Sequence, residues 1–413
     1  SLKVEKCLTM NRESGFQENW CNRNDKLSRN LVSEERVTAA ALTTPSARQG
    51  DDRCFPKTNK KREQKGELPL LPCWEKLKND GYPSGLIEAL LQEKDRSPLR
   101  FWLIDNSASM LARDVQIPAR DADGRHEMIT ATRWSELRST VEYHAELAGM
   151  MNAASVFMFT NDPIDVRIPK KFTVATGRDA ESIPREVEKA KYIMQMCQPQ
   201  GSSSTTACLD KTRARIQKAS SALMAGGQKA IIVLVTDGIP DEGKEVFLET
   251  LESMKQLPLR VVVRLCTYEK EVCEFYEEFD NKEDLPLEVV PTYAKEAKEV
   301  QRRNPWLQYC LPLHRVREIG GCQSRVLDLL DERKLKKDEL REFLALIFGE
   351  AQITQAPDAR RDWKGFVKAI TPVIKEESFI VNQKTKKREA WIDLRRLEKA
   401  YGAGFWQKVA ARK

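Results

Sequence analysis

The chain has 413 residues, of which 41% are hydrophobic and 32% are charged, and its formal net charge is +7. This length leaves room for two or three domains and for at least one well-buried core. No apolar run is long enough to span a membrane, and the polar first ten residues do not resemble a secretory signal. A charge of +7 over this length is too small to indicate nucleic-acid binding by itself.

Cysteine usage indicates a reducing compartment. The ten cysteines are scattered along the chain, and none of them forms a Cys-x-x-Cys pair. Two of them, Cys208 and Cys266, lie in or beside expected core elements, where free cysteines act as small hydrophobic residues. We therefore expect an intracellular, cytoplasmic protein, with a nuclear location left open.

The first third of the chain predicts little regular structure. Residues 1–68 are rich in Asn, Arg, Lys, Ser and Thr and lack a periodic apolar face, so we expect this region to be disordered or weakly structured. Residues 69–96 predict one or two short amphipathic helices, broken near Gly81 and Pro83. We expect these helices to pack as a flap on the domain that follows.

An alternation of strands and helices follows. Apolar runs predict strands over 99–104, 155–159, 230–236, 260–266 and 287–290. Helical spacing predicts helices over 134–152, 182–197, 207–225, 244–256, 269–280 and 294–303. Helices between buried strands are typical of a parallel sheet covered on both faces. The predicted fold class is α/β, with a doubly wound, mostly parallel sheet flanked by helices.

Polar side chains follow the first strand of this series. Asp105, Ser107 and Ser109 place three hard oxygen donors on one turn. If the sheet is parallel, this turn lies at the carboxyl edge, where open α/β sheets hold their ligands. Taken alone, the turn is equally consistent with a helix cap.

Two later loops add to this edge. Residues 201–206 offer a cluster of hydroxyl groups before the helix at 207–225, and Asp237 and Gly238 directly follow the strand at 230–236. Two carboxylates with several hydroxyls, and no thiol or imidazole, suit a small hard divalent cation such as Mg²⁺. We therefore predict a divalent-cation site at this edge of the sheet.

This constellation resembles the von Willebrand factor type A domain and its metal-ion-dependent adhesion site. That family has Asp-x-Ser-x-Ser after the first strand, a Thr in a second loop, and an Asp, usually followed by Gly, after a later strand. Asp105, Ser107, Ser109 and Asp237 match this pattern in type, spacing and order. Either Ser203 or Thr205 takes the place of the family's Thr. The resemblance covers residues 97–305, with an unusual insertion between residues 111 and 133.

The resemblance implies a binding module with Mg²⁺ or Mn²⁺ as its cofactor. In such domains the hydroxyls ligate the metal directly, and an acidic side chain of a protein partner completes its coordination. Because no signal sequence or disulfide framework is evident, we expect an intracellular member of this family and not an adhesion receptor. The resemblance implies a scaffold and not an enzyme.

Two alternatives remain open. A phosphatase of the haloacid-dehalogenase type would use Asp105, Ser203, Lys229, Asp237 and Asp241, but Ser107 stands where that family has a second Asp as general acid. The other alternative is a scaffold associated with nucleic acid. Residues 306–413 predict a small, mainly helical extension whose basic run at 384–388 and basic ending at 411–413 would make that contact.

Overall fold

The computed structural model describes residues 71–120, 126–177, 180–280, 282, 285–320, 324–377, 380–381 and 388–402. The region predicted to be weakly structured, 1–68, lies outside these residues. So do most of the basic run at 384–388 and all of the basic ending at 411–413.

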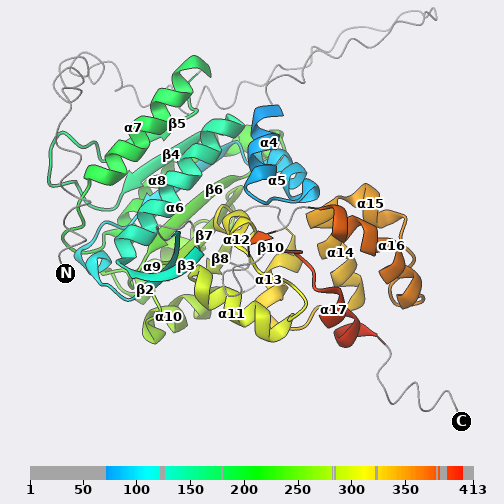
Figure 1. Cartoon of the computed structure of the whole chain (residues 1–413). Helices are drawn as coiled ribbons and strands as arrows, with labels where there is room; N and C mark the ends of the chain where they lie inside the picture. The colour runs from blue at the N-terminus through cyan, green and yellow to red at the C-terminus, as the bar shows by residue number, and fades with distance from the viewer. Residues whose placement is uncertain are drawn as a thin grey trace, which may run out of the picture. The chain divides into compact units, whose positions relative to one another are not determined.

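A six-stranded sheet forms the centre of the described chain (Figure 1). Its strand order is β5-β4-β1-β6-β7-β8, and only the edge strand β5 runs antiparallel to its neighbour. The strands are β1 (Leu99–Ile104), β4 (Ser155–Phe159), β5 (Lys171–Val174), β6 (Ala230–Thr236), β7 (Leu259–Leu265) and β8 (Leu287–Val290). The sequence-based expectation of a mostly parallel α/β sheet is confirmed.

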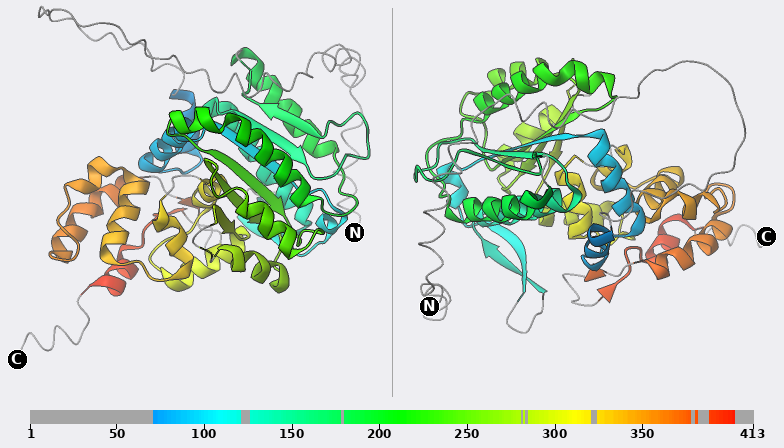
Figure 2. Two further views of the ribbon diagram at one scale, coloured as in Figure 1. Left: turned by 180° about the vertical axis from the view of Figure 1, so that it is seen from behind. Right: turned by 90° about the horizontal axis from the view of Figure 1, so that it is seen from above.

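Helices cover both faces of the sheet, which explains why every residue of β1 and β6 is buried. Figure 2 shows α6 and α7 on one face and α8 and α9 on the other. The helices along this part of the chain are α6 (Arg133–Met151), α7 (Ile183–Met196), α8 (Thr205–Ala225), α9 (Lys244–Glu252), α10 (Lys270–Asp280) and α11 (Tyr293–Arg303); the short 3₁₀ helices are η2 (Ala108–Leu111) and η3 (Ala180–Ser182).

Helix α6 illustrates how local sequence sets the element boundaries. The Thr132 hydroxyl accepts a hydrogen bond from the Ser135 N–H and caps the first turn. At the other end, Asn152 takes a left-handed conformation with φ 50°, which closes the helix. Between them, Leu137, Val141 and Ala145 pack into the core together with Trp102 and Ile104 of β1.

The insertion predicted between residues 111 and 133 contains an antiparallel hairpin. Its strands are β2 (Val115–Arg120) and β3 (His126–Ala131), and they pair only with each other among the described strands. The sequence analysis predicted no strand in this insertion. It also missed β5, whose four residues alternate between buried and half-buried positions.

Helix α12 (Leu311–Glu318) is buried against the sheet through charged side chains. The Glu318 carboxylate accepts hydrogen bonds from His144 Nε2 of α6 at 2.8 Å and from Arg264 Nε of β7 at 3.1 Å. Arg315 Nη1 donates to the same carboxylate at 2.8 Å and to the Thr140 hydroxyl at 2.8 Å. His144 is itself buried.

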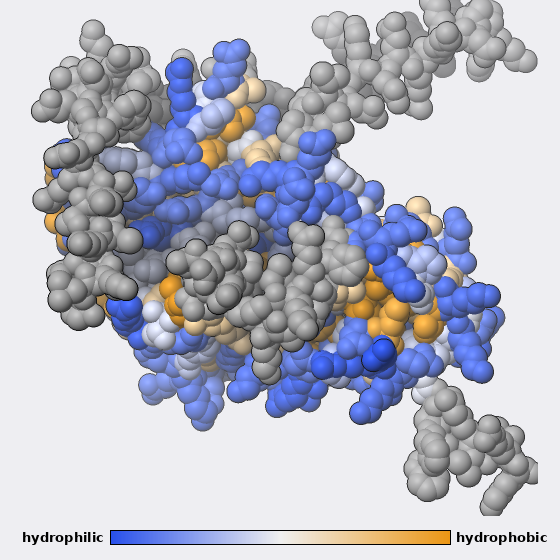
Figure 3. Space-filling view, viewed as in Figure 1, coloured by the Kyte–Doolittle hydropathy of each residue, from blue (hydrophilic) through white to orange (hydrophobic). Residues whose placement is uncertain are grey.

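The chain ends in further helices and a small two-stranded sheet. These are α13 (Arg325–Glu332), α14 (Lys337–Phe348), α15 (Glu350–Thr354), α16 (Trp363–Glu376), β9 (Ile380–Val381), β10 (Arg388–Glu389) and α17 (Leu394–Tyr401). Figure 3 shows polar side chains over most of the face seen in Figure 1, with apolar side chains visible among these helices. No helix within the described ranges is both long and apolar enough to cross a membrane.

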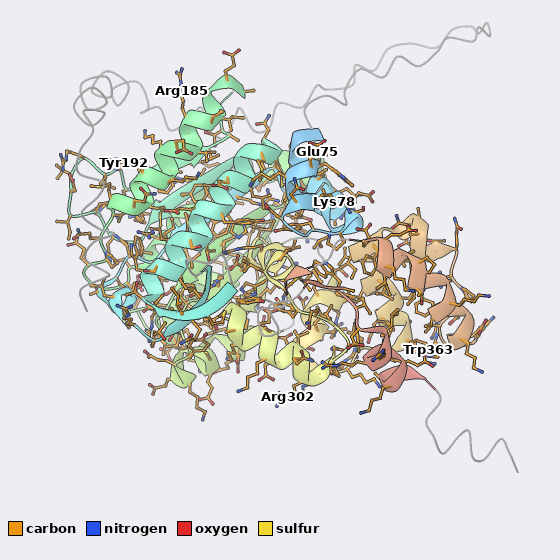
Figure 4. All side chains as sticks on the ribbon, in the orientation of Figure 1. Glu75, Lys78, Arg185, Tyr192, Arg302 and Trp363 are labelled. Carbon is orange, nitrogen blue, oxygen red and sulfur yellow. The ribbon has the colours of Figure 1, made fainter. Side chains whose placement is uncertain are left out.

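The predicted flap consists of α4 (Leu71–Asn79) and α5 (Ser84–Arg96), and it contacts the C-terminal helices. Lys78 of α4, labelled in Figure 4, forms an ion pair with Glu377 at 2.7 Å. A Cβ atom on Gly85 of α5 would lie 2.2 Å from the Gly349 nitrogen after α14, so only glycine fits there. One contiguous apolar core runs from α4 across one sheet face to α17. The domain divisions at 68/69, 96/97 and 305/306 stay predictions.

Candidate metal centre

The candidate site lies where the chain reverses its direction of winding across the sheet. After β1 the chain adds β4 and β5 on one side, and it then crosses to add β6, β7 and β8 on the other. The loops that follow β1 and β6 therefore diverge from adjacent strand ends and leave a crevice for ligands. Asp105 and Asp237 stand in these two loops, and the Asp105 N–H donates to the Val235 carbonyl at 2.9 Å.

Asp105 is fully buried, with 0% of its surface exposed. Its Oδ1 accepts a hydrogen bond from the Ser107 N–H at 2.9 Å, which fixes the first turn of the loop. Its Oδ2 accepts from the hydroxyls of Ser203 at 3.0 Å and Thr236 at 2.6 Å. Sequence reasoning missed Thr236, which stands directly before Asp237 and turns its hydroxyl to the same carboxylate.

The hydroxyls of the first loop connect Asp105 to Asp237. Ser107 Oγ and Ser109 Oγ lie 3.0 Å apart, and Ser109 Oγ donates to Asp237 Oδ1 at 2.8 Å. Asp237 is 1% exposed, whereas Ser109 is exposed. The predicted residues of the first and third loops therefore meet at one point that solvent reaches from the Ser109 side.

The second loop brings Ser203 into direct contact with this group. Thr205 lies behind it, with its hydroxyl 2.6 Å from Ser203 Oγ. Both side chains are buried. Ser203 is therefore the second-loop residue that touches a carboxylate of the site, and Thr205 reaches the site through Ser203.

Backbone hydrogen bonds hold the first two loops together. The Gln200 N–H donates to the Asn106 carbonyl at 2.7 Å, and the Ala108 N–H donates to the Gly201 carbonyl at 3.0 Å. Because these bonds do not involve the hydroxyls, the side chains that converge on Asp105 are positioned by the loops themselves.

A buried cation also reaches the site. Arg133, the first residue of α6, donates from Nη1 to Asp237 Oδ2 at 2.9 Å. It was not singled out from the sequence. Its position offered a signal, because a cation in the first turn of a helix opposes the helix dipole and must gain its stabilisation elsewhere.

Burial governs the electrostatics of Asp237. It raises the pKa of the Asp237 carboxyl above its usual value, and the neighbouring Asp105 charge raises it further. Hydrogen bonds from Arg133 and Ser109 favour the charged form and oppose this shift. A buried pair of carboxylates with one guanidinium is short of positive charge, which favours binding of a cation.

The donor set fits a hard divalent cation. Two carboxylates and hydroxyls from two loops converge, with successive oxygen atoms 2.6–3.0 Å apart. Oxygens that each bind Mg²⁺ at about 2.1 Å on adjacent octahedral positions are separated by about 3.0 Å. Among the described residues no group of three His, Cys, Asp or Glu side chains could hold a metal, so hydroxyls are needed here.

Lys229 does not join the other residues of the phosphatase alternative. Lys229 directly precedes β6, whereas Asp237 directly follows it. The two positions flank the seven residues of this strand, which separates them by about 26 Å at the usual rise per residue. Lys229 therefore lies at the opposite edge of the sheet from Asp105, and the phosphatase alternative is not favoured.

Comparisons with known proteins add little. No family model and no curated protein matches the chain. The structure is similar to the VWA domain of SpRpn10, at 16% identity and a TM-score of 0.29, over 47% of this chain and 87% of that one. It is also similar to manganese-loaded Plasmodium vivax TRAP protein, at 16% identity and a TM-score of 0.25, over 41% of this chain and 57% of that one. At these values the likenesses support no functional argument. The proposed function rests on the geometry of the site.

Proposed function

We propose that this chain is an intracellular scaffold of the von Willebrand factor type A kind that binds a protein partner through a divalent cation. Asp105, Ser107, Ser109, Asp237 and the second-loop hydroxyl of Ser203 or Thr205 would hold Mg²⁺ or Mn²⁺. The observation that carries this proposal is the hydrogen-bonded convergence of these side chains at the switch point of the sheet.

The chemistry of the donor set favours an acidic ligand from the partner. Hydroxyl groups donate electron pairs without adding charge, and only two carboxylates belong to the proposed set. A cation held in this way keeps an affinity for a further hard oxygen ligand. The exposed Ser109 marks the side from which a partner carboxylate would approach.

We also propose a binding role in preference to catalysis. Ser107 stands where a phosphatase of the haloacid-dehalogenase type needs a general acid, and Lys229 is at the far edge of the sheet. The proposed intracellular location is supported by six described cysteines, all buried and free of disulfides. The nucleic-acid alternative depends on basic segments that lie almost wholly outside the described residues.

The test is thermal unfolding of the wild type, Asp237→Ala and Ser107→Ala in the presence and absence of Mg²⁺ and Mn²⁺. An ion that binds only the folded state stabilises it by about 2.7 kcal/mol at a hundredfold excess over its dissociation constant. We expect the wild type to gain melting temperature with metal and both variants to lose that gain. Ser202→Ala is the matched control, because Ser202 is in the same loop and its side chain is exposed.

Turnover of a phosphomonoester is measured in the same samples. Metal stabilisation without turnover supports the binding module. Turnover that Asp105→Asn abolishes would establish the phosphatase instead, and a wild type that no metal stabilises would contradict the cation site.

A further inference from the structure

The guanidinium of Arg133 is held by three carboxylates from separate segments. Besides Asp237, Arg133 contacts Asp114, which lies just before the hairpin strand β2, with Nε 3.0 Å from Oδ1. Its Nη2 also donates to Glu269, which lies between β7 and α10. Arg133 itself is 3% exposed. These pairs raise its pKa despite its burial, so the guanidinium stays charged.

The contact with Arg133 leaves Asp237 fully engaged. Its Oδ1 accepts from Ser109, and its Oδ2 accepts from Arg133. A divalent cation at the site would have to share this carboxylate with a positive charge that is already bound to it. The divalent cation and the Arg133 guanidinium, both in contact with the Asp237 carboxylate, would repel each other. Because the site is buried, solvent would screen this repulsion only weakly.

We propose that Arg133 is a resident cation that competes with the divalent ion for Asp237 and thereby weakens the affinity of the site for metal. This inference rests on the proposed function. Arg133 holds the Asp237 carboxylate in place when no metal is bound, and it raises the metal concentration needed to fill the site.

The other two carboxylates can continue to pair with Arg133 when Asp237 binds the metal. The Asp114 side chain is 42% exposed and that of Glu269 is 56% exposed, so water solvates both carboxylates in part. Arg133 can keep both of these pairs while giving up one hydrogen bond. Metal binding at Asp237 therefore does not require the Arg133 guanidinium to move into water.

The test is the dissociation constant for Mn²⁺ in the full chain, measured by calorimetry for the wild type, Arg133→Met and Arg133→Lys. We expect Arg133→Met to bind Mn²⁺ at least about tenfold more tightly than the wild type, because the competing charge is gone. Its melting temperature without metal should be lower. Arg133→Lys keeps a charge but lacks the planar fork that joins three carboxylates, so we expect an intermediate affinity.

The matched control is Arg138→Met on the same helix, where the side chain is 41% exposed and pairs with Glu142. It should leave the Mn²⁺ affinity unchanged. If Arg133→Met folds poorly, tighter binding by Arg133→Lys still supports the proposal, and unchanged binding refutes it.

The outcomes separate this inference from the proposed function. If the wild type binds Mn²⁺ and the Arg133 variants bind it equally or more weakly, the competition is refuted and the cation site stands. If none of these proteins binds Mn²⁺, both are refuted. Binding by Arg133→Met that is far tighter than the wild type's supports both.

Discussion

The buried carboxylate of Glu318 should be a principal determinant of stability. It accepts hydrogen bonds from His144, Arg264 and Arg315, and it also forms an ion pair with His314 at 3.3 Å. Burial alone would raise its pKa, but the neighbouring positive groups, Arg315 first, lower it well below its usual value. The change to test is Glu318→Ala.

Removing one partner of a buried ion pair costs about 3–5 kcal/mol, because the other charge is left without compensation. Here Arg264 keeps its pair with Glu136 at 2.5 Å, and Arg315 keeps its hydrogen bond to Thr140. We therefore expect about 4 kcal/mol for Glu318→Ala. Glu318→Gln keeps the shape and one acceptor, and it should cost about 2 kcal/mol.

Urea denaturation followed by circular dichroism gives these free energies of unfolding from the transition midpoints. Glu299→Ala is the control, since Glu299 pairs with Arg302 on the surface and its loss should cost less than about 0.5 kcal/mol. A cost below about 1 kcal/mol for Glu318→Ala would show that α12 does not depend on this network and would refute the reasoning.

Three further predictions follow from named contacts. Burial lowers the pKa of His144 to about 4, below its unfolded value of about 6.5. The contribution of neutral His144 to the free energy of unfolding is therefore complete above pH 6.5 and is lost as the pH falls toward 4. Between pH 7 and pH 5 the wild type should lose about 2 kcal/mol more stability than His144→Gln, and equal losses in urea titrations would contradict this. Gly85→Ala should destabilise the protein by more than about 2 kcal/mol, because its Cβ would overlap the backbone at Gly349, whereas Gly238→Ala meets open space and should be neutral by thermal unfolding. Ser203→Ala should weaken Mn²⁺ binding more than Thr205→Val, because Ser203 contacts Asp105 directly; the reverse order would make Thr205 the ligand.

The sheet could be predicted because its central strands are continuous apolar runs. β1, β4, β6 and β8 have the bounds that the sequence predicted, and β7 differs by one residue. β5 could not be predicted, because an edge strand of four residues with half-buried positions carries no such run.

Helix α12 was not predicted as a separate element, and Pro312 lies near its start. Proline is tolerated in the first turn, where its missing N–H is not needed. The charged residues Arg315, Arg317 and Glu318 suggest a surface helix in isolation. Their partners come from α6, β7 and α11, so only the folded chain shows that they are buried.

The candidate site could be predicted as far as strand topology determines it. A parallel sheet brings the carboxyl ends of β1 and β6 to one edge, and this places Asp105 and Asp237 together. The choice between Ser203 and Thr205 could not be made, because both stand in one loop and only its conformation shows which hydroxyl reaches Asp105. The position of Arg133 in the first turn of a helix offered a signal, but its contacts could not be predicted because its partners Asp237 and Glu269 are more than a hundred residues away.

The most direct test of the cation site is equilibrium binding of Mn²⁺, measured from the electron paramagnetic resonance signal of the free ion, with the wild type and Asp237→Ala side by side. We predict that the wild type removes a single ion per chain from solution in a saturable way and that Asp237→Ala does not. Equal binding by the two proteins, or no binding by the wild type at millimolar Mn²⁺, would contradict a cation held between Asp105 and Asp237.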